Sequence, residues 1–306
     1  MDGRDKPGPD SEGQRRSVTA VLIDKAAAKI NLTLRVLGRR PDGYHRLESL
    51  MAFADLCDTL SLQPGGATTL ALSGPFASAC AAGADNLVLK AFGALHARVG
   101  GLRGGGFSLD KNIPVAAGIG GGSADAAAAL RLLARANSLE SGDPRLADAA
   151  LAVGADVPVC LQSRTRIVRG IGEELAPAIE LPRVAALLVN PGVALATREV
   201  FAALAVKPQS QSRPPIVEVP RAPEALIDFL ARHDNDLTAA AIACLPVVAD
   251  VLAELRALPG ARLVRMSGSG PTCFALFAST GEAAAAAARL STARARWWVC
   301  PASIGP

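Results

Sequence analysis

A run of glycines between a short apolar segment and an alanine- and leucine-rich one constrains this chain more than any other feature. The stretch reads IPVAAGIGGGSADAAAALRLL, and its glycines are Gly118, Gly120, Gly121 and Gly122. Glycine lets a backbone approach a ligand closely and turn its N–H groups inward. A helix beginning at Ser123 would add free amides and the positive end of its dipole. The stretch therefore predicts a phosphate site between a strand and a helix.

The glycine spacing argues against two common phosphate loops. No Lys-Ser or Lys-Thr pair follows the glycines, so this is not a Walker A loop. Ser123 stands three residues after Gly120, where the dinucleotide fingerprint needs a third glycine, and this speaks against an NAD-dependent oxidoreductase. A plain flexible connector remains the structural alternative for a lone glycine-rich loop.

Length and composition bound the class of protein. The 306 residues, half of them hydrophobic, are enough for two domains with separate cores. A net charge of +4 with scattered basic residues gives no nucleic-acid footprint. The six cysteines form no CxxC pair, which predicts reduced thiols and no zinc site. Since no apolar run reaches about 18 residues and no signal peptide is recognisable, we expect a cytoplasmic protein without membrane contact.

The first half of the chain predicts strands followed by helices. Residues 1–17 are polar and rich in proline and glycine, so we expect a disordered tail. Short apolar stretches on both sides of the turn Pro41–Gly43 predict strands in an antiparallel or mixed sheet. Further along we expect a helix over 85–99 capped by Asp85, a strand over 107–114, and helices over 123–137 and 144–153.

The second half alternates in the same way. We expect strands over 164–172 and 184–190, then an exposed loop over Lys207–Pro223 that is rich in Pro, Ser and Gln. Helical patterns resume up to Pro259, and the chain ends as strand, glycine turn, strand, helix and strand. The first domain is expected to end near residue 176.

Five motifs occur in order between Lys25 and Phe277: AKINL, PDGYH, GIGGGSADA, GADVP and SGSGP. Together they resemble the GHMP superfamily of small-molecule kinases. The resemblance implies an α+β fold of two domains, an N-terminal ribosomal-S5-like domain over 18–176 and a C-terminal ferredoxin-like domain over 177–306, with the active site in the cleft. AKINL and PDGYH further resemble the members that phosphorylate a cytidyl-diphosphate alcohol in the non-mevalonate isoprenoid pathway.

Two other functions remain open at this point. Another kinase of the superfamily, acting on homoserine, mevalonate or a sugar, would keep the glycine loop without a base-stacking segment such as PDGYH. A non-catalytic nucleotide-binding module could retain the fold without transferring phosphate.

The resemblance implies which residues hold ATP. The loop is expected to contact the phosphates through Pro114, Val115, Ala116, Ala117, Gly118, Ile119, Gly120, Gly121, Gly122, Ser123 and Ala124. The family often has Met and Gly where this chain has Val115 and Ala116. Asn86 and Lys111 stand where the family lines its adenine pocket, although a helix cap or a surface charge would explain them equally well.

Two charged residues stand inside apolar runs. Asp156 lies in GADVPVCL and Lys29 in AAAKINLTL, and burying either charge alone would be costly, so we expect the two to pair. The resemblance implies that Asp156 is the base that accepts the proton of the substrate hydroxyl and that Lys29 holds that hydroxyl. The alternative is a structural ion pair.

Tyr44 is the only tyrosine, and the turn before it would present its ring to solvent or a cleft. An aromatic face suits stacking on a pyrimidine, and His45 could bond its edge. The resemblance implies that Tyr44 and Phe201 sandwich cytosine and that Asn31, His45 and Thr197 surround the rest of the substrate. The segment NPGVALATREVF departs from the family pattern Ser-Ile-Pro-Thr-Pro at Ala194, Leu195, Ala196 and Arg198.

The cofactors implied are ATP and Mg²⁺. The sequence does not identify the metal ligands, since magnesium uses substrate phosphates and water as ligands, and Ser123 is named only as a guess. The expected partner is a small-molecule cytidyl diphosphate substrate, with no nucleic acid, no membrane and no obligate protein partner.

Overall fold

The computed structural model describes residues 20–81, 83–204 and 214–305. The predicted tail and part of the predicted loop Lys207–Pro223 lie outside these ranges. The strands are β1 (Leu22–Asn31), β2 (Arg35–Arg39), β3 (His45–Pro64), β4 (Thr69–Ser73), β5 (Gly105–Asp110), β6 (Arg166–Gly170), β7 (Glu174–Leu175), β8 (Val184–Asn190), β9 (Leu263–Met266), β10 (Cys273–Phe277) and β11 (Trp298–Ile304). The helices are α1 (Leu87–His96), α2 (Gly121–Ala136), α3 (Pro144–Val153), α4 (Val157–Gln162), α5 (Thr197–Ala203), α6 (Pro223–Ala231), α7 (Thr238–Cys244), α8 (Val247–Arg256) and α9 (Thr280–Ala293).

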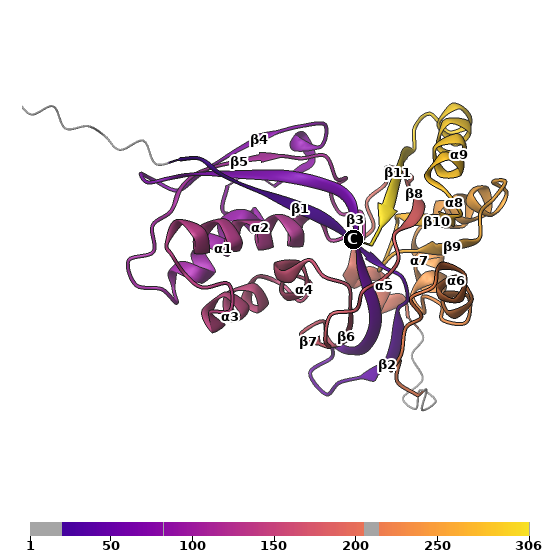
Figure 1. Ribbon diagram of the computed structural model, residues 1–306, viewed down its shortest axis with the longest axis horizontal. Coiled ribbons are helices and arrows are strands. Elements are labelled where there is room, and N and C mark those ends of the chain that lie inside the picture. The colour runs from indigo at the N-terminus through magenta and orange to yellow at the C-terminus, as the bar shows by residue number, and fades with distance from the viewer. Residues whose placement is uncertain (1–19, 82, 205–213, 306) are drawn as a thin grey trace, which may run out of the picture.

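The twenty-residue strand β3 organises the N-terminal half. It pairs antiparallel with β1, β2, β5 and β6, and helices α1 to α4 gather on one side of this sheet (Figure 1). Helix α2 packs closely on the sheet because Ala126–Ala129, which are fully buried, carry only methyl side chains. This packing fixes the start of α2, and with it the end of the glycine loop, against the sheet.

The C-terminal half is the expected ferredoxin-like unit. Its strands run in the spatial order β11-β8-β10-β9 with every pair antiparallel, and α8 and α9 supply the two crossovers. All seven residues of β8 are buried because both faces of the strand are covered. Leu187 and Val189 face the core around α8 and α9, whereas Ala186 and Leu188 face α6 and the N-terminal half.

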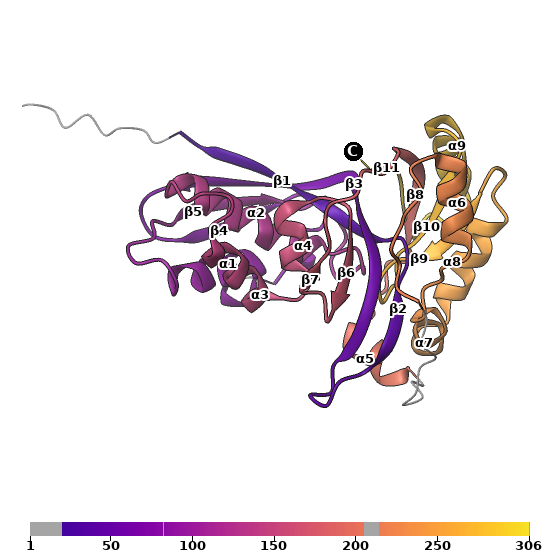
Figure 2. The same cartoon turned by 60° about the horizontal axis from the view of Figure 1, so that its bottom comes forward.

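The two halves meet where β3 passes beside β11. Ile304 pairs with Ala54 at that point, so one eleven-stranded sheet continues from one half into the other. Figure 2 shows the N-terminal helices on one side of this junction and the C-terminal helices on the other. The exact division at residues 176 and 177 stays a prediction.

Several element starts differ from the predictions, and two of them involve predicted site residues. Asp85 does not cap α1: it ends a 3-10 turn, and Asn86 is the cap, accepting a hydrogen bond from the Val88 amide at 2.9 Å. Helix α2 begins at Gly121 rather than at Ser123, with Gly120 in the left-handed region before it. Among the described residues, no helix has the length and apolar character needed to cross a bilayer.

Candidate active site

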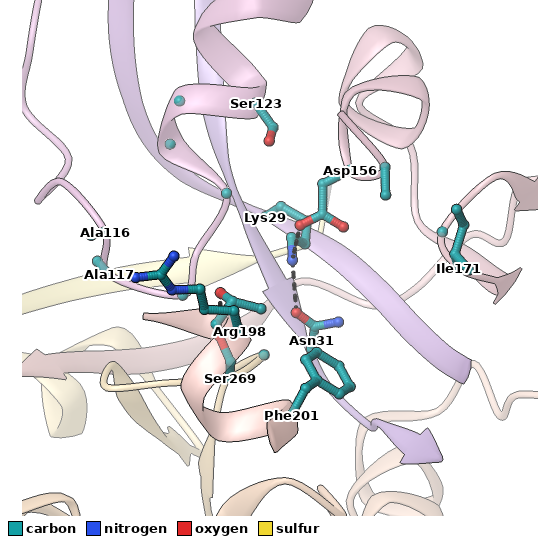
Figure 3. A pocket seen from close by; sticks show the side chains of 18 of the residues that line it. Lys29, Asn31, Ala116, Ala117, Ser123, Asp156, Ile171, Arg198, Phe201 and Ser269 are labelled. Carbon is teal, nitrogen blue, oxygen red and sulfur yellow. Dashed lines mark hydrogen bonds and ion pairs between the residues drawn. The ribbon is translucent and has the colours of Figure 1, made fainter. Parts of the chain in front are cut away.

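A cavity of about 950 Å³ lies between the two halves of the molecule. Its wall includes the glycine loop, the charged residues of AKINL and GADVP, and the aromatic residues after the PDGYH turn (Figure 3). Most of the predicted site residues line it: Lys29, Asn31, Tyr44, His45, Asn86, Lys111, Val115, Ala116, Ala117, Gly118, Gly120, Gly121, Gly122, Ser123, Asp156, Thr197 and Phe201.

Three predicted loop residues do not line the cavity. Pro114, Ile119 and Ala124 are buried, and the side chains of Ile119 and Ala124 belong to the two cores on either side of the loop. Because these side chains pack into the protein interior, they anchor the loop rather than contact a ligand.

Two glycines of the loop, Gly118 and Gly120, stand where a side chain would be strained. Gly118 and Gly120 have φ of +74° and +67°, in the left-handed region that favours glycine. A Cβ at Gly118 would overlap the carbonyl oxygen of Gly270, and one at Gly120 would lie 3.0 Å from the Lys29 Cε. Ala116 takes a φ of 54°, so it adopts without glycine the conformation that the family's glycine would adopt freely.

The turn Ser267–Pro271, the SGSGP motif, is called the late glycine turn below, and it packs against the glycine loop. The Thr272 amide donates to the Ala117 carbonyl at 3.2 Å, and the Ser267 hydroxyl donates to the Gly118 carbonyl at 3.3 Å. Two loop carbonyls are thus bound away from the cavity. Amides at the start of α2 remain without intrahelical partners and can donate hydrogen bonds to an anion.

The predicted ion pair exists. Lys29 Nζ lies 3.0 Å from Asp156 Oδ2 and donates to Asn31 Oδ1 at 2.8 Å (Figure 3). A bulge in β1 between Ala27 and Lys29 shifts the register there, and bulges commonly re-aim a side chain beside an active site. The Lys29 side chain is 5% exposed.

Asp156 is less buried than predicted. Its side chain is 36% exposed because it sits at the cap of α4, on the cavity wall, rather than in the interior of an apolar run. Its carboxylate makes no capping bond to its own helix. It is therefore paired on one side with Lys29 and open on the other to the cavity.

Lys111 is a buried lysine that pairs with two carboxylates, rather than a surface charge. It is 2% exposed and forms ion pairs with Asp58 and, at 2.6 Å, with Asp125. Burial alone lowers the pKa of this ammonium, but Asp125 and Asp58 outweigh it, so the pKa is raised. The other oxygen of Asp58 accepts from the amides of Asn112 and Ile113 at 2.6 and 2.8 Å, which fixes the chain just before the loop.

Asp125 directly follows the predicted phosphate-binding residues, and its environment was not foreseen. Burial raises its pKa from 3.8 to about 7, against the opposing charge of Lys111. Its second oxygen, Oδ1, has no hydrogen-bond partner among the described residues. Asp125 also lines the cavity.

Aromatic groups gather at the far end of the cavity. Tyr44 is 61% exposed, and the ring of His45 stacks on Phe201 with centroids 5.1 Å apart. Burial, and then the charge of Arg39, lowers the pKa of His45. Thr197 bonds the Ser269 hydroxyl at 2.9 Å, which ties α5 to the late glycine turn.

Two family models match this chain. The one described as GHMP kinases N terminal domain covers residues 86–164, and the one described as GHMP kinases C terminal covers residues 220–295. Together they span both halves of the fold, including the glycine loop and Asp156.

Curated relatives match along nearly the whole chain. A 4-diphosphocytidyl-2-C-methyl-D-erythritol kinase from Rhodopseudomonas palustris is 55% identical over 291 residues, 92% of this chain and 97% of the relative. One of the same description from Methylorubrum extorquens is 52% identical over 289 residues, 93% and 99% of the two chains.

Solved structures of kinases match the fold of this chain. A crystal structure of 4-(cytidine 5'-diphospho)-2C-methyl-D-erythritol kinase has a TM-score of 0.71 at 34% identity, covering 93% of this chain and 100% of its own. A homoserine kinase from Cytophaga hutchinsonii has a TM-score of 0.66 at 16% identity, covering 97% of both chains, and this likeness shows the fold alone. The chain thus belongs to the GHMP kinases, and among them to the family of the 4-diphosphocytidyl-2-C-methyl-D-erythritol kinases.

Proposed function

We propose that this chain transfers the γ-phosphoryl group of ATP to the 2-hydroxyl of 4-diphosphocytidyl-2-C-methyl-D-erythritol, in the non-mevalonate route to isoprenoid precursors. The observation that carries the proposal is the Lys29–Asp156 ion pair at 3.0 Å, in a cavity with a glycine loop at one end and aromatic residues at the other. The relatives that bear this name cover almost all of the chain.

The proposed reaction needs few groups. The substrate oxygen bonds to the γ-phosphorus, the bond from that phosphorus to the β-bridging oxygen breaks, and the hydroxyl proton goes to the Asp156 carboxylate. Lys29, held by Asn31, orients the carboxylate and the hydroxyl. Since phosphoryl transfer has a loose transition state, positioning and charge neutralisation account for most of the catalysis.

The phosphates of ATP would lie on the backbone of Val115–Ser123, where the amides at the start of α2 are free to donate. Asn86 and Lys111 would border the adenine. Because Asn86 already caps α1 and Lys111 already holds two carboxylates, both side chains would act from fixed positions.

A magnesium ion would enter with the triphosphate. Among the described residues, no group of three or more His, Cys, Asp or Glu side chains is placed to hold a metal ion. Oxygen donors do exist on the cavity wall, in the Ser123 hydroxyl and the Asp156 carboxylate. This sparse set fits magnesium, which keeps several waters and uses substrate phosphates as ligands. The ion would neutralise phosphate charge.

The cytosine would enter between Tyr44 and Phe201, with His45, Asn31 and Thr197 around the remaining polar groups. The Phe201 face is covered by the His45 ring in this structure, so the imidazole would have to shift or share that face. The exposed Tyr44 ring is free to fold over the base from the other side.

Other acceptors are less favoured. Homoserine and mevalonate carry no base, so they would leave the aromatic end of the cavity unused. A non-catalytic nucleotide-binding module would not need a carboxylate that is paired with an amine and also open to the cavity, as Asp156 is.

An ADP-release assay across candidate alcohols tests the proposal. We expect turnover with the cytidyl substrate and none with homoserine, mevalonate or galactose. Asp156→Asn should lower kcat by roughly a thousandfold or more while ADP still protects the protein thermally. Asp148→Asn, at an exposed position on α3, is the matched control. Faster turnover of homoserine or mevalonate, or a kcat for Asp156→Asn within about tenfold of the wild type, would contradict the proposal.

A further inference from the structure

Four cationic side chains line the cavity, and they differ in what they already bind. They are Lys29, Arg39, Lys111 and Arg198. The two lysines are committed: Lys29 pairs with Asp156, and Lys111 pairs with the carboxylates of Asp58 and Asp125. Neither lysine therefore brings a free positive charge to an incoming phosphate.

The two arginines differ from each other. Arg39 donates through Nε to the Gly43 carbonyl at 3.2 Å, and its charge acts on His45, which places it at the aromatic end of the cavity. Arg198 makes no side-chain hydrogen bond or ion pair with any of the described residues and is exposed on the cavity wall. Of the four cavity-lining cations named above, Arg198 is the one without a side-chain partner in the described part of the chain.

The neighbours of Arg198 place it beside the glycine loop. It is the second residue of α5, directly after Thr197, whose hydroxyl bonds Ser269 in the late glycine turn. The next residue of that turn, Gly270, packs against Gly118 of the loop. In Figure 3 the Arg198 side chain extends from α5 toward Ala116 and Ala117, on the side of the cavity away from Phe201.

A guanidinium suits this position for a chemical reason. It stays charged at any working pH and offers a planar fork of donors that matches two phosphate oxygens. The loop itself offers only backbone amides, which carry partial charges. From the geometry we infer that Arg198 binds a phosphate group of a nucleotide ligand, a role that the committed lysines leave open.

This inference rests on the proposed function for the ligands that it names. The phosphate could come from the ATP side, along the loop, or from the diphosphate of the cytidyl substrate, which must pass between the aromatic end and Asp156. Both share the same chemistry, so the test treats ADP and CDP as separate probes, each with its nucleoside as the phosphate-free control.

Calorimetric titrations of Arg198→Ala with ADP, adenosine, CDP and cytidine decide the matter. We expect the Kd of one diphosphate to rise roughly tenfold or more, the usual loss for a hydrogen bond to a charged group, and the nucleosides to stay within twofold. The probe that weakens identifies the source. Arg198→Lys should recover part of the affinity, because it keeps the charge but not the fork.

Arg289→Ala removes an exposed arginine from α9, outside the cavity wall, and should change none of the four Kd values. The inference is overturned if both diphosphates bind Arg198→Ala within twofold of the wild type, or if the nucleosides weaken as much as the diphosphates. Its failure is separate from that of the proposed function: a wild type that turns over no cytidyl substrate refutes the function, while the ADP titration still decides Arg198.

Discussion

The contact between Gly118 and Gly270 makes a quantitative prediction. In Gly118→Ala, the new Cβ would overlap the Gly270 carbonyl oxygen and lie 2.8 Å from its carbon, well inside ordinary van der Waals distance. Because these are backbone atoms, a rotamer change cannot relieve the overlap. Either the glycine loop or the late turn must move by several tenths of an ångström or more.

The cost has two parts. An alanine at φ +74° costs roughly 1–2 kcal/mol in the left-handed region. Separating the loop from the turn also strains the bonds that join them, from Thr272 to Ala117 and from Ser267 to Gly118. Each hydrogen bond contributes about 1 kcal/mol, so the loss of both would bring the total fall in the free energy of unfolding to about 3–4 kcal/mol.

The effect on catalysis should be larger than the effect on stability. A displacement of about 1 Å in groups that position a reactant can lower the rate on the order of a hundredfold. We expect kcat to fall by that amount, with the KM for ATP raised because the loop amides no longer converge. Urea unfolding and the ADP-release assay measure the two effects separately.

Gly122→Ala is the matched control. Gly122 lies in the same loop and lines the same cavity, but its φ is not in the left-handed region, and a Cβ there would meet only the flexible end of Leu87 at 3.1 Å. The reasoning is refuted if Gly118→Ala is as stable and as active as Gly122→Ala, because the interlocked loop and turn would then have no effect.

Two further predictions concern buried charges. Because burial raises the pKa of Asp125 from 3.8 to about 7, the folded protein binds more protons than the unfolded chain in this window, so this carboxyl's contribution to stability falls as pH rises from about 4 to 7. Urea midpoints across that range should show the wild type losing stability relative to Asp125→Asn as pH rises; a constant difference would contradict this. Glu48, 1% exposed, pairs with Arg35 at 2.8 Å and Arg169 at 2.9 Å, so Glu48→Ala should destabilise the protein by about 3–5 kcal/mol, and a chemical-denaturation loss below about 1 kcal/mol would contradict it.

The Lys29–Asp156 pair was predictable because each residue carries the isolated charge of an apolar run, and an isolated buried charge needs a partner. The exposure of Asp156 was not, since it depends on where α4 begins. Asp85 and Asn86 are both good capping residues, and the sequence does not say which of two neighbours takes the cap.

The cluster of Lys111 with Asp58 and Asp125 shows a second limit. Asp58 lies in the strand-like run LCDTLSL, and nothing in that run distinguishes it from an aspartate that faces solvent. Its partner Lys111 is 53 positions away. The antiparallel pairing of β3 with β5 brings them together, and single-sequence patterns do not contain that register. The glycine motif was recognisable because its chemistry lies in consecutive residues, whereas this support depends on tertiary pairing.

The paired charges bear on how such a site holds two anionic ligands. Lys29 and Lys111 face three carboxylates before any ligand enters, so these two lysines leave little net positive charge in the cavity. Attraction for phosphate must then come from backbone amides and from cations that remain free. Amides set in a rigid loop need little reorganisation when the γ-phosphoryl group moves, and this is the condition under which electrostatic stabilisation is most effective. Under the proposed function, the lysines would therefore fix geometry, and the loop, whose shape Gly118 and Gly270 maintain together, would supply the cradle for the phosphates.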